Sequence, residues 1–337
     1  MNWIDNARVV AVFAVVFLHV SLEVVFGAEI GSFNWWVGNI YNSFVRWCVP
    51  LFVMISGFLL LDPEKNEDIK TFYAKRVSRI LIPLVFWSVF FSIYTFLKGM
   101  MLRGEHITLL SLGKNILQGV PYGHMWFLYM ILGLYLITPF FRKLVKALPI
   151  NEASFFCMIM FAMALITIAI DRLYLKGSTL FINWYLPFLP YYLAGYLIGK
   201  SNVGPYKCIN MISVVILSLL TAAGCYMLSK KCGIQQGLYF YNYLSITVIP
   251  ASLSIFMILK EFNMPIIRKI AKEIAPLTLG IYIIHIIFIE MLRFIAGFTP
   301  LKFTPFISIP ASALIVFLLS VITCRILISI PSLKRVI

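Results

Sequence analysis

Long runs of apolar residues constrain this chain more than any other feature of its sequence. A helix needs about 20 such residues to cross a hydrocarbon core about 30 Å thick, and several runs reach or approach that length. Only 12% of residues are charged, against about 25% in a soluble domain. The segment 211–220 is apolar on every side, whereas barrel strands alternate. Unpaired backbone groups are costly in lipid, so we expect an all-α, polytopic helix bundle in a lipid bilayer.

Polar residues divide the chain into about ten expected transmembrane helices. The predicted spans are 8–26, 39–61, 79–97, 125–141, 154–170, 184–199, 209–228, 239–259, 277–296 and 306–330. We find no low-complexity linker or appended soluble segment between them. Residues 1–337 are therefore predicted to form a single membrane-embedded domain.

The net charge of +15 is distributed unevenly between alternate loops. With the N-terminus in the cytoplasm, the cytoplasmic segments hold 18 of the 28 Lys and Arg residues and the outer loops hold nine. This bias follows the positive-inside rule, and it predicts that both termini are cytoplasmic. The expected location is a bacterial cytoplasmic (inner) membrane, and we expect no nucleic acid as a partner, because topology explains the basic residues.

The first predicted span carries Arg8, His19 and Glu23. The eleven residues from Arg8 to His19 place them only about 20° apart around a helix and about 16 Å apart along it, and Glu23 follows one turn later. Ionisable groups in a membrane usually face a polar cavity. This face is a candidate catalytic site in which Glu23 fixes the tautomer of His19. The alternative is a structural hydrogen bond from His19, with Glu23 hydrated at the outer surface.

Basic residues also gather before the third span, at Lys75, Arg76 and Arg79. Spacings of three and four residues turn them onto neighbouring helix faces at the inner mouth of this span. Such an arrangement attracts phosphate groups. The positive-inside rule alone also requires basic residues here, so composition leaves both interpretations open.

The segment 123–128 begins the fourth span and contains His124 and Trp126. These side chains are candidates for the wall of a sugar-binding site, although Trp is also enriched at membrane interfaces.

The segment 280–285 in the ninth span contains Tyr282 and His285. An intramembrane His is a functional candidate by default, and packing against a neighbouring helix is the alternative. Glu290 and Arg293 follow three residues apart and are predicted to form an ion pair.

Several chemistries are excluded by their missing motifs. The six Cys residues show no spacing typical of a metal or redox site, so no metal is expected. The sequence also contains no P-loop, G-x-S-x-G or H-E-x-x-H motif. The chemistry that the sequence still allows is acid–base catalysis by histidine in a membrane cavity.

Taken together, these motifs resemble the acyltransferase-3 family of integral membrane O-acyltransferases. Arg8 followed after ten residues by His19 looks like the family's Arg-x10-His signature, although Ala7 stands where the family commonly has Leu. The likeness covers nearly the whole chain, continuing through 49–58, 75–79, 124–127 and 279–285.

The resemblance implies transfer of an acyl group, usually acetyl from cytoplasmic acetyl-CoA, to a hydroxyl of a cell-surface glycan or lipid-linked saccharide. His19 is then the general base or the acyl carrier, with Glu23 beside it. The residues expected to bind the donor are Arg8, Lys75, Arg76 and Arg79. The residues expected to bind the acceptor are His124, Trp126, Tyr282 and His285. The competing hypothesis is a transporter of a small solute such as an amino acid, because buried polar residues also suit a transport path.

Overall fold

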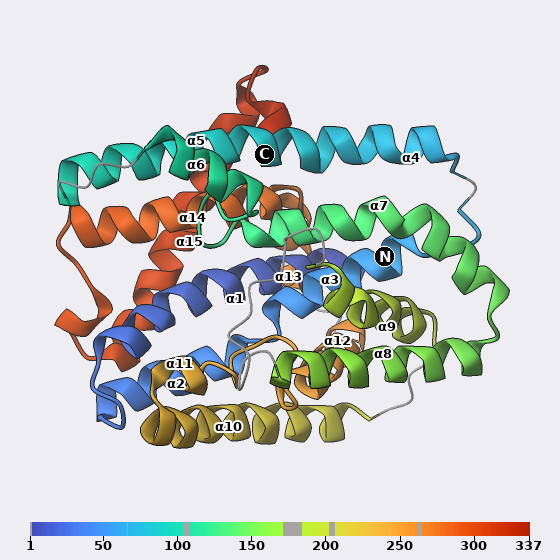
Figure 1. Cartoon of the computed structure of the whole chain (residues 1–337), viewed down its shortest axis with the longest axis horizontal. Coiled ribbons are helices and arrows are strands. Elements are labelled where there is room, and N and C mark those ends of the chain that lie inside the picture. The colour runs from blue at the N-terminus through green and yellow to red at the C-terminus, as the bar shows by residue number, and fades with distance from the viewer. Residues whose placement is uncertain (1, 66, 104–107, 171–183, 202–205, 262–264) are drawn as a thin grey trace.

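The computed structural model describes all residues except 1, 66, 104–107, 171–183, 202–205 and 262–264. Every regular element among these residues is a helix, as predicted, and most of the longer helices run roughly along the longest axis of the molecule, whereas α15 crosses it (Figure 1). The α-helices are α1 (Asn2–Gly27), α2 (Phe33–Val45), α3 (Cys48–Leu60), α4 (Ile69–Arg76), α5 (Ile82–Lys98), α6 (Leu109–Leu117), α7 (Trp126–Ala147), α8 (Ile150–Ile170), α9 (Leu189–Lys200), α10 (Lys207–Cys232), α11 (Ile234–Gly237), α12 (Val248–Glu261), α13 (Pro265–Ile274), α14 (Thr278–Phe294) and α15 (Pro305–Ser329).

Short π-helical and 3-10 turns extend or join these helices. The π-helical turns are η1 (Val77–Leu81) and η2 (Gly99–Arg103), on either side of α5. The 3-10 turns are η5 (Leu186–Phe188), η6 (Ala275–Leu277), η7 (Pro300–Lys302) and η8 (Lys334–Val336).

Eight helical segments in the described part of the chain are long and apolar enough to cross a membrane. They correspond to eight of the predicted spans and confirm a polytopic helix bundle. The predicted spans 184–199 and 239–259 fold differently, because α9 has 12 residues and α12 has 14. At a rise of 1.5 Å per residue such helices reach only about 18–21 Å, less than the hydrocarbon thickness. The cytoplasmic location of the termini stays a prediction.

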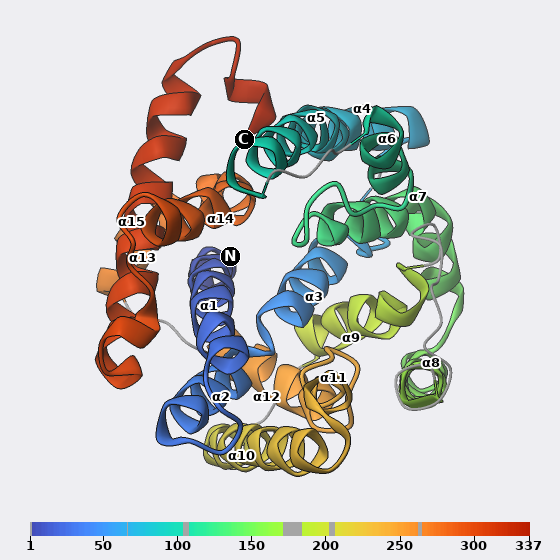
Figure 2. The same cartoon turned by 60° about the vertical axis from the view of Figure 1, so that its left-hand side comes forward.

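Helix α1 lies inside the ring of the other helices (Figure 2). It contacts α2, α3, α12, α13, α14 and α15. Small side chains permit this crowding, since Ala7, Ala11 and Ala14 are all buried. A helix surrounded by protein presents its polar side chains to other helices instead of to lipid, and this places His19 in the interior.

Helices α3 and α9 pack closely against each other. A Cβ atom added at Gly57 would lie 2.7 Å from the carbonyl carbon of Tyr192, and one added at Gly195 would lie 2.5 Å from that of Met54. Only glycine leaves room for backbones at this separation. Glycine at position 57 is therefore required by packing.

The segment 238–247, which precedes α12, forms a series of turns inside the protein. Its backbone groups bond to side chains from other helices: Arg46 donates to the carbonyl oxygen of Tyr241 at 3.0 Å, and the Tyr191 hydroxyl donates to that of Tyr243 at 2.6 Å. Non-helical backbone within a membrane protein is tolerated where protein buries it or where it lines a cavity. These bonds explain why the predicted span 239–259 is only partly helical.

Candidate active site

Three histidines from distant parts of the sequence meet inside the bundle. His19 lies on α1, His285 on α14 and His124 in the turn before α7. The ring centroids of His19 and His285 are 5.1 Å apart, and those of His285 and His124 are 5.5 Å apart. His124 and His285 are buried, whereas His19 keeps partial solvent exposure. The sequence singled out each histidine, and the structure places them in one cluster.

Backbone carbonyl groups orient two of these imidazoles. Nδ1 of His285 lies 3.2 Å from the carbonyl oxygen of Ile281, and Nε2 of His124 lies 2.9 Å from that of Ile283. A carbonyl oxygen only accepts hydrogen bonds, so these ring nitrogens carry the protons. In the neutral rings, Nε2 of His285 and Nδ1 of His124 are then acceptors. Both are buried and lack a hydrogen-bond partner among the described residues.

Aromatic side chains line the same region. The Tyr282 hydroxyl donates a hydrogen bond to the backbone carbonyl oxygen of His124, which ties α14 to the start of α7. The ring of Trp126 lies 5.8 Å from that of Tyr243 at an interplanar angle of 24°, and 5.7 Å from that of Phe188. The partly exposed Trp126 thus continues a stacked aromatic surface that includes the partly buried Tyr243 ring.

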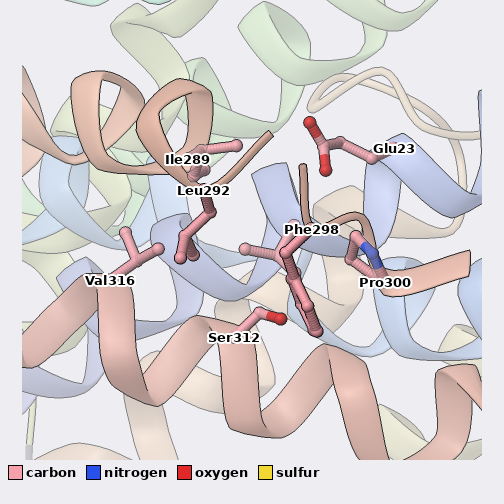
Figure 3. Close-up of a pocket in the computed structure, with 8 residues that line it drawn as sticks. Glu23, Ile289, Leu292, Phe298, Pro300, Ser312 and Val316 are labelled. Carbon is pink, nitrogen blue, oxygen red and sulfur yellow. The ribbon is translucent and has the colours of Figure 1, made fainter. Parts of the chain in front are cut away.

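Glu23 follows His19 by one turn of α1, but its partner is Arg293 of α14, with an N–O distance of 4.0 Å. Figure 3 shows the Glu23 carboxylate beside a small pocket whose labelled lining includes Phe298 and Ser312. The predicted hydrogen bond from His19 to the Glu23 carboxylate, which would fix the His19 tautomer, is replaced by this ion pair between α1 and α14. Glu23 lies near the C-terminal end of α1, where the side chain of Arg293 is within reach.

The predicted Glu290–Arg293 pair does not form, because each residue has a partner on another helix. Glu290 accepts hydrogen bonds from Lys98 at 2.6 Å and from the hydroxyl groups of Tyr94 and Tyr122. These contacts join α5, the turn before α7 and α14. The partners of Glu23 and Glu290 depend on which helices lie beside α1 and α14, and spacing along the sequence does not reveal this.

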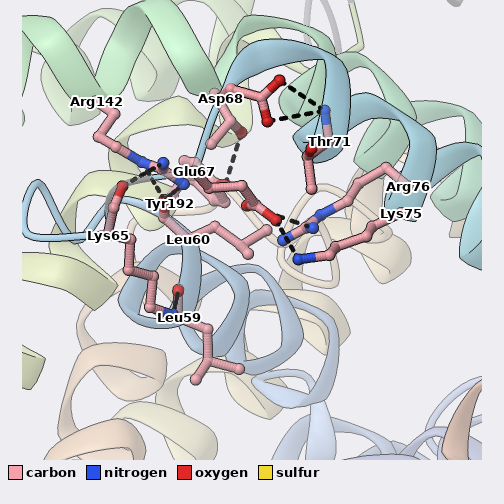
Figure 4. A network of polar contacts seen from close by, with 11 residues as sticks. Leu59, Leu60, Lys65, Glu67, Asp68, Thr71, Lys75, Arg76, Arg142 and Tyr192 are labelled. Carbon is pink, nitrogen blue, oxygen red and sulfur yellow. Dashed lines mark hydrogen bonds and ion pairs between the residues drawn. The ribbon is translucent and has the colours of Figure 1, made fainter.

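The basic residues at the end of α4 share one acidic partner, Glu67 (Figure 4). Lys75 Nζ lies 2.7 Å from the Glu67 carboxylate and Arg76 Nη1 lies 3.8 Å from it. The Arg76 guanidinium also stacks on Phe72, 4.3 Å from the ring centroid. The hydrogen bond from Lys75 holds the pKa of Glu67 below its ordinary value, against the opposing effect of burial. Glu67 is therefore charged at neutral pH and offsets one of the two positive charges.

Arg8 and Arg79 form no ion pair with any described residue. Arg79 is exposed on η1, and Arg8 is half-buried in the first third of α1. The structure thus places three of the four predicted donor-binding cations on the continuous α4–η1 segment and the fourth on α1.

Two buried arginines were not predicted as site residues. Arg142 on α7 donates through Nε and Nη2 to the carbonyl oxygen of Leu60 and through Nη1 to that of Lys65, so it caps the C-terminal end of α3. Arg46 lies between α2 and α3, and it is the only charged residue in the run 39–61. An isolated charge in an apolar run is the sequence feature that could have identified Arg46 as a candidate site residue.

No three His, Cys, Asp or Glu side chains lie close enough to hold a metal ion in the part of the chain that the structure describes. The imidazoles of the three histidines can donate and accept hydrogen bonds and exchange protons.

Comparison with known proteins agrees with this arrangement. A family profile described as an acyltransferase domain matches residues 1–325. The chain is also 23% identical over 266 residues to a protein of Acidianus two-tailed virus that bears the name "Putative acetyltransferase ORF330", covering 72% of this chain and 73% of that protein. No solved structure matches the chain. Because the family profile spans nearly all of this multi-pass membrane protein, the chain belongs to the acyltransferase-3 family.

Proposed function

We propose that this membrane acyltransferase transfers an acetyl group from acetyl-CoA to a hydroxyl of a cell-surface glycan or lipid-linked saccharide, in a bacterial cytoplasmic membrane. The histidine cluster carries the proposal, because a partly exposed His19 imidazole lies beside two buried ring nitrogens that only accept hydrogen bonds. Family membership supports the acyl-transfer chemistry. The segments 3–6 and 279–285 resemble those of the O-acetyltransferase of enterobacterial common antigen, which favours a glycan acceptor.

The acceptor site follows from the two unpaired nitrogens. Leaving a buried acceptor unpaired costs about 1–3 kcal/mol. A ligand hydroxyl that donates a hydrogen bond to His285 Nε2 or His124 Nδ1 removes this cost. A saccharide supplies several such hydroxyls on a rigid ring. Its apolar face suits the surface formed by Trp126 and Tyr243.

His19 would perform the chemistry. A sugar hydroxyl is a weak nucleophile at neutral pH, and a neutral imidazole that removes its proton during attack contributes about 10²–10⁴-fold to the rate. Imidazole is also a competent nucleophile, so an acyl-histidine intermediate followed by transfer uses the same residue. Both routes require an imidazole that solvent and substrate can reach, as the partial exposure of His19 supports.

The cations on α4–η1 and α1 would hold the donor. Coenzyme A carries several phosphate charges, and Arg binds phosphate with two parallel hydrogen bonds. Arg79 has no acidic partner among the described residues, and the Lys75 side chain is 56% exposed. Arg8 and Arg76 would complete the site, with the pantetheine arm extending towards His19.

The reaction is tested with purified protein in liposomes, acetyl-CoA and a mixture of saccharides and lipid-linked saccharides. Mass spectrometry should show products heavier by one acetyl group, and His19→Ala should abolish them while leaving thermal unfolding close to wild type. Acetylation by His19→Ala at the wild-type rate would remove His19 from the mechanism. Solute flux without an acyl donor, combined with no acetylated product, would favour the transporter hypothesis.

The donor site is tested by Arg76→Ala combined with Arg79→Ala. We expect weaker binding of acetyl-CoA and little change in the KM for the acceptor. Arg325→Ala is the matched control, because Arg325 is an exposed residue of α15 paired with Glu273 at 2.8 Å. Unchanged donor affinity in the double variant would refute the phosphate role of α4–η1.

A further inference from the structure

Arg46 is a buried cation fixed on one side only. Its side chain is 8% exposed. Nε donates to Oδ1 of Asn42 at 2.6 Å, Nη1 donates to the carbonyl oxygen of Tyr241 at 3.0 Å, and the guanidinium lies 4.0 Å from the centroid of the Tyr241 ring. One edge of the guanidinium is therefore held in place. Its third nitrogen, Nη2, has no hydrogen bond to any residue that the structure describes.

Arg142 shows how the chain compensates a buried cation when the role is structural. It has the same 8% exposure as Arg46, yet all three of its side-chain nitrogens bond to carbonyl oxygens. Two of them bond to the carbonyl of Leu60 at the end of α3, where the helix dipole is negative, and the third bonds to that of Lys65 in the following loop. Arg46 has no such partner, and none of the ion pairs among the described residues includes it. A buried charge without a counter-charge is costly, and within a membrane it marks a functional site.

Asn42 connects this cation to the turn of α1 that carries His19. Its Nδ2 donates to the carbonyl oxygen of Leu18 and to Oγ of Ser21, both at 2.8 Å. These two bonds fix the orientation of the amide, so Oδ1 faces Arg46. The guanidinium of Arg46 is thus linked through Asn42 to the helical turn that carries His19.

We propose that Arg46 stabilises the negative charge that forms on the acyl carbonyl oxygen during transfer. This inference rests on the proposed function. In the attack step, the acceptor hydroxyl oxygen bonds to the carbonyl carbon, its proton passes to His19, and the electron pair of the C=O bond moves to the oxygen beside Arg46. When the intermediate collapses, that pair re-forms the C=O bond and the C–S bond breaks. The sulfur leaves as thiolate and takes the proton from His19, giving the ester and coenzyme A.

A guanidinium suits this role because it stays protonated at all relevant pH values. Charge held in a pre-formed, low-dielectric position needs no reorganisation when the oxyanion develops, and the loss of one such donor lowers kcat by about 10²–10³-fold. The bonds to Asn42 and Tyr241 supply that pre-organisation. The missing counter-charge is then explained, since the charge that completes the site appears only during the reaction.

The test compares Arg46→Gln, Arg46→Lys and Arg142→Gln with wild type in the liposome acetylation assay. Arg46→Gln should lower kcat about 10²–10³-fold with the KM values for acetyl-CoA and acceptor nearly unchanged. Arg46→Lys keeps the charge but loses the planar guanidinium group, so its kcat should lie between those of wild type and Arg46→Gln. Arg142→Gln should lower the melting temperature while each folded molecule keeps the wild-type kcat.

The outcomes separate this inference from the proposed function. Absence of acetylation by wild type overturns both. Acetylation by wild type together with a wild-type kcat in Arg46→Gln overturns only the role of Arg46. A raised acceptor KM at unchanged kcat also overturns it, because Arg46 would then bind an anionic group of the acceptor. If Arg46→Gln does not fold, Arg46→Lys decides, and a wild-type kcat in that variant refutes oxyanion stabilisation by the guanidinium fork.

Discussion

Gly57→Ala tests the close packing of α3 on α9. An added methyl group at this position would overlap the carbonyl oxygen of Tyr192 and would lie 2.7 Å from its carbonyl carbon, whereas carbon atoms in contact are usually about 3.5–4.0 Å apart. The two helices must therefore separate by more than about 1 Å. Such overpacking typically costs 1–3 kcal/mol, and occasionally more. We expect a value near 3 kcal/mol, because backbone atoms cannot rotate away.

Thermal unfolding of the purified protein in detergent measures this effect. At about 2–4 °C per kcal/mol for a large domain, the melting temperature of Gly57→Ala should fall by roughly 6–12 °C. The control is Gly113→Ala in α6, where an added Cβ meets nothing within 4 Å and the helix gains about 0.5–1 kcal/mol. Gly195→Ala separates the same two helices, so its effect should not add fully to that of Gly57→Ala. A wild-type melting temperature for Gly57→Ala would refute the contact.

Three further predictions each concern one side chain. Glu290→Gln removes the charge that Lys98 and two tyrosine hydroxyl groups share, so it should lower stability by about 1–3 kcal/mol in the same unfolding assay; no change would show that the cluster is not stabilising. Trp126→Ala should raise the KM for a saccharide acceptor more than it lowers kcat, and an unchanged KM would remove Trp126 from the acceptor site. The Lys75 hydrogen bond lowers the pKa of Glu67 in the folded protein, so its stabilising effect is complete above the ordinary carboxyl pKa and is lost as the pH falls through the lowered value. Between about pH 3 and 6, the stability of Glu67→Gln should therefore depend less on pH than that of wild type, and equal slopes would contradict this.

The fold was largely predictable because the bilayer requires long apolar helices. The sequence predicted helices at every described span, including the central α1. It did not predict the shortness of α9 and α12. The turns at 238–247 depend on side chains such as Arg46 and Tyr191, which bond to their backbone from other helices. No local pattern contains that information.

The candidate site was predicted residue by residue but not as an arrangement. His19, His124 and His285 stood out because ionisable groups are rare in apolar runs, and the structure brings them together. The partners of Glu23 and Glu290 were not predictable, because spacing along one helix says nothing about which neighbour faces it. Arg46 is the only charged residue in the run 39–61, but its missing counter-charge becomes visible only in the folded structure.

The most direct test of the mechanism is an experimental structure of the protein with a non-hydrolysable thioether analogue of acetyl-CoA. We predict the phosphate groups against α4–η1, the pantetheine arm inside the bundle and the acyl carbonyl between His19 and Arg46. Density for the acyl group on the lipid-facing surface, or solid packing between η1 and His19 with the analogue bound elsewhere, would contradict the assignment of His19 as the catalytic residue.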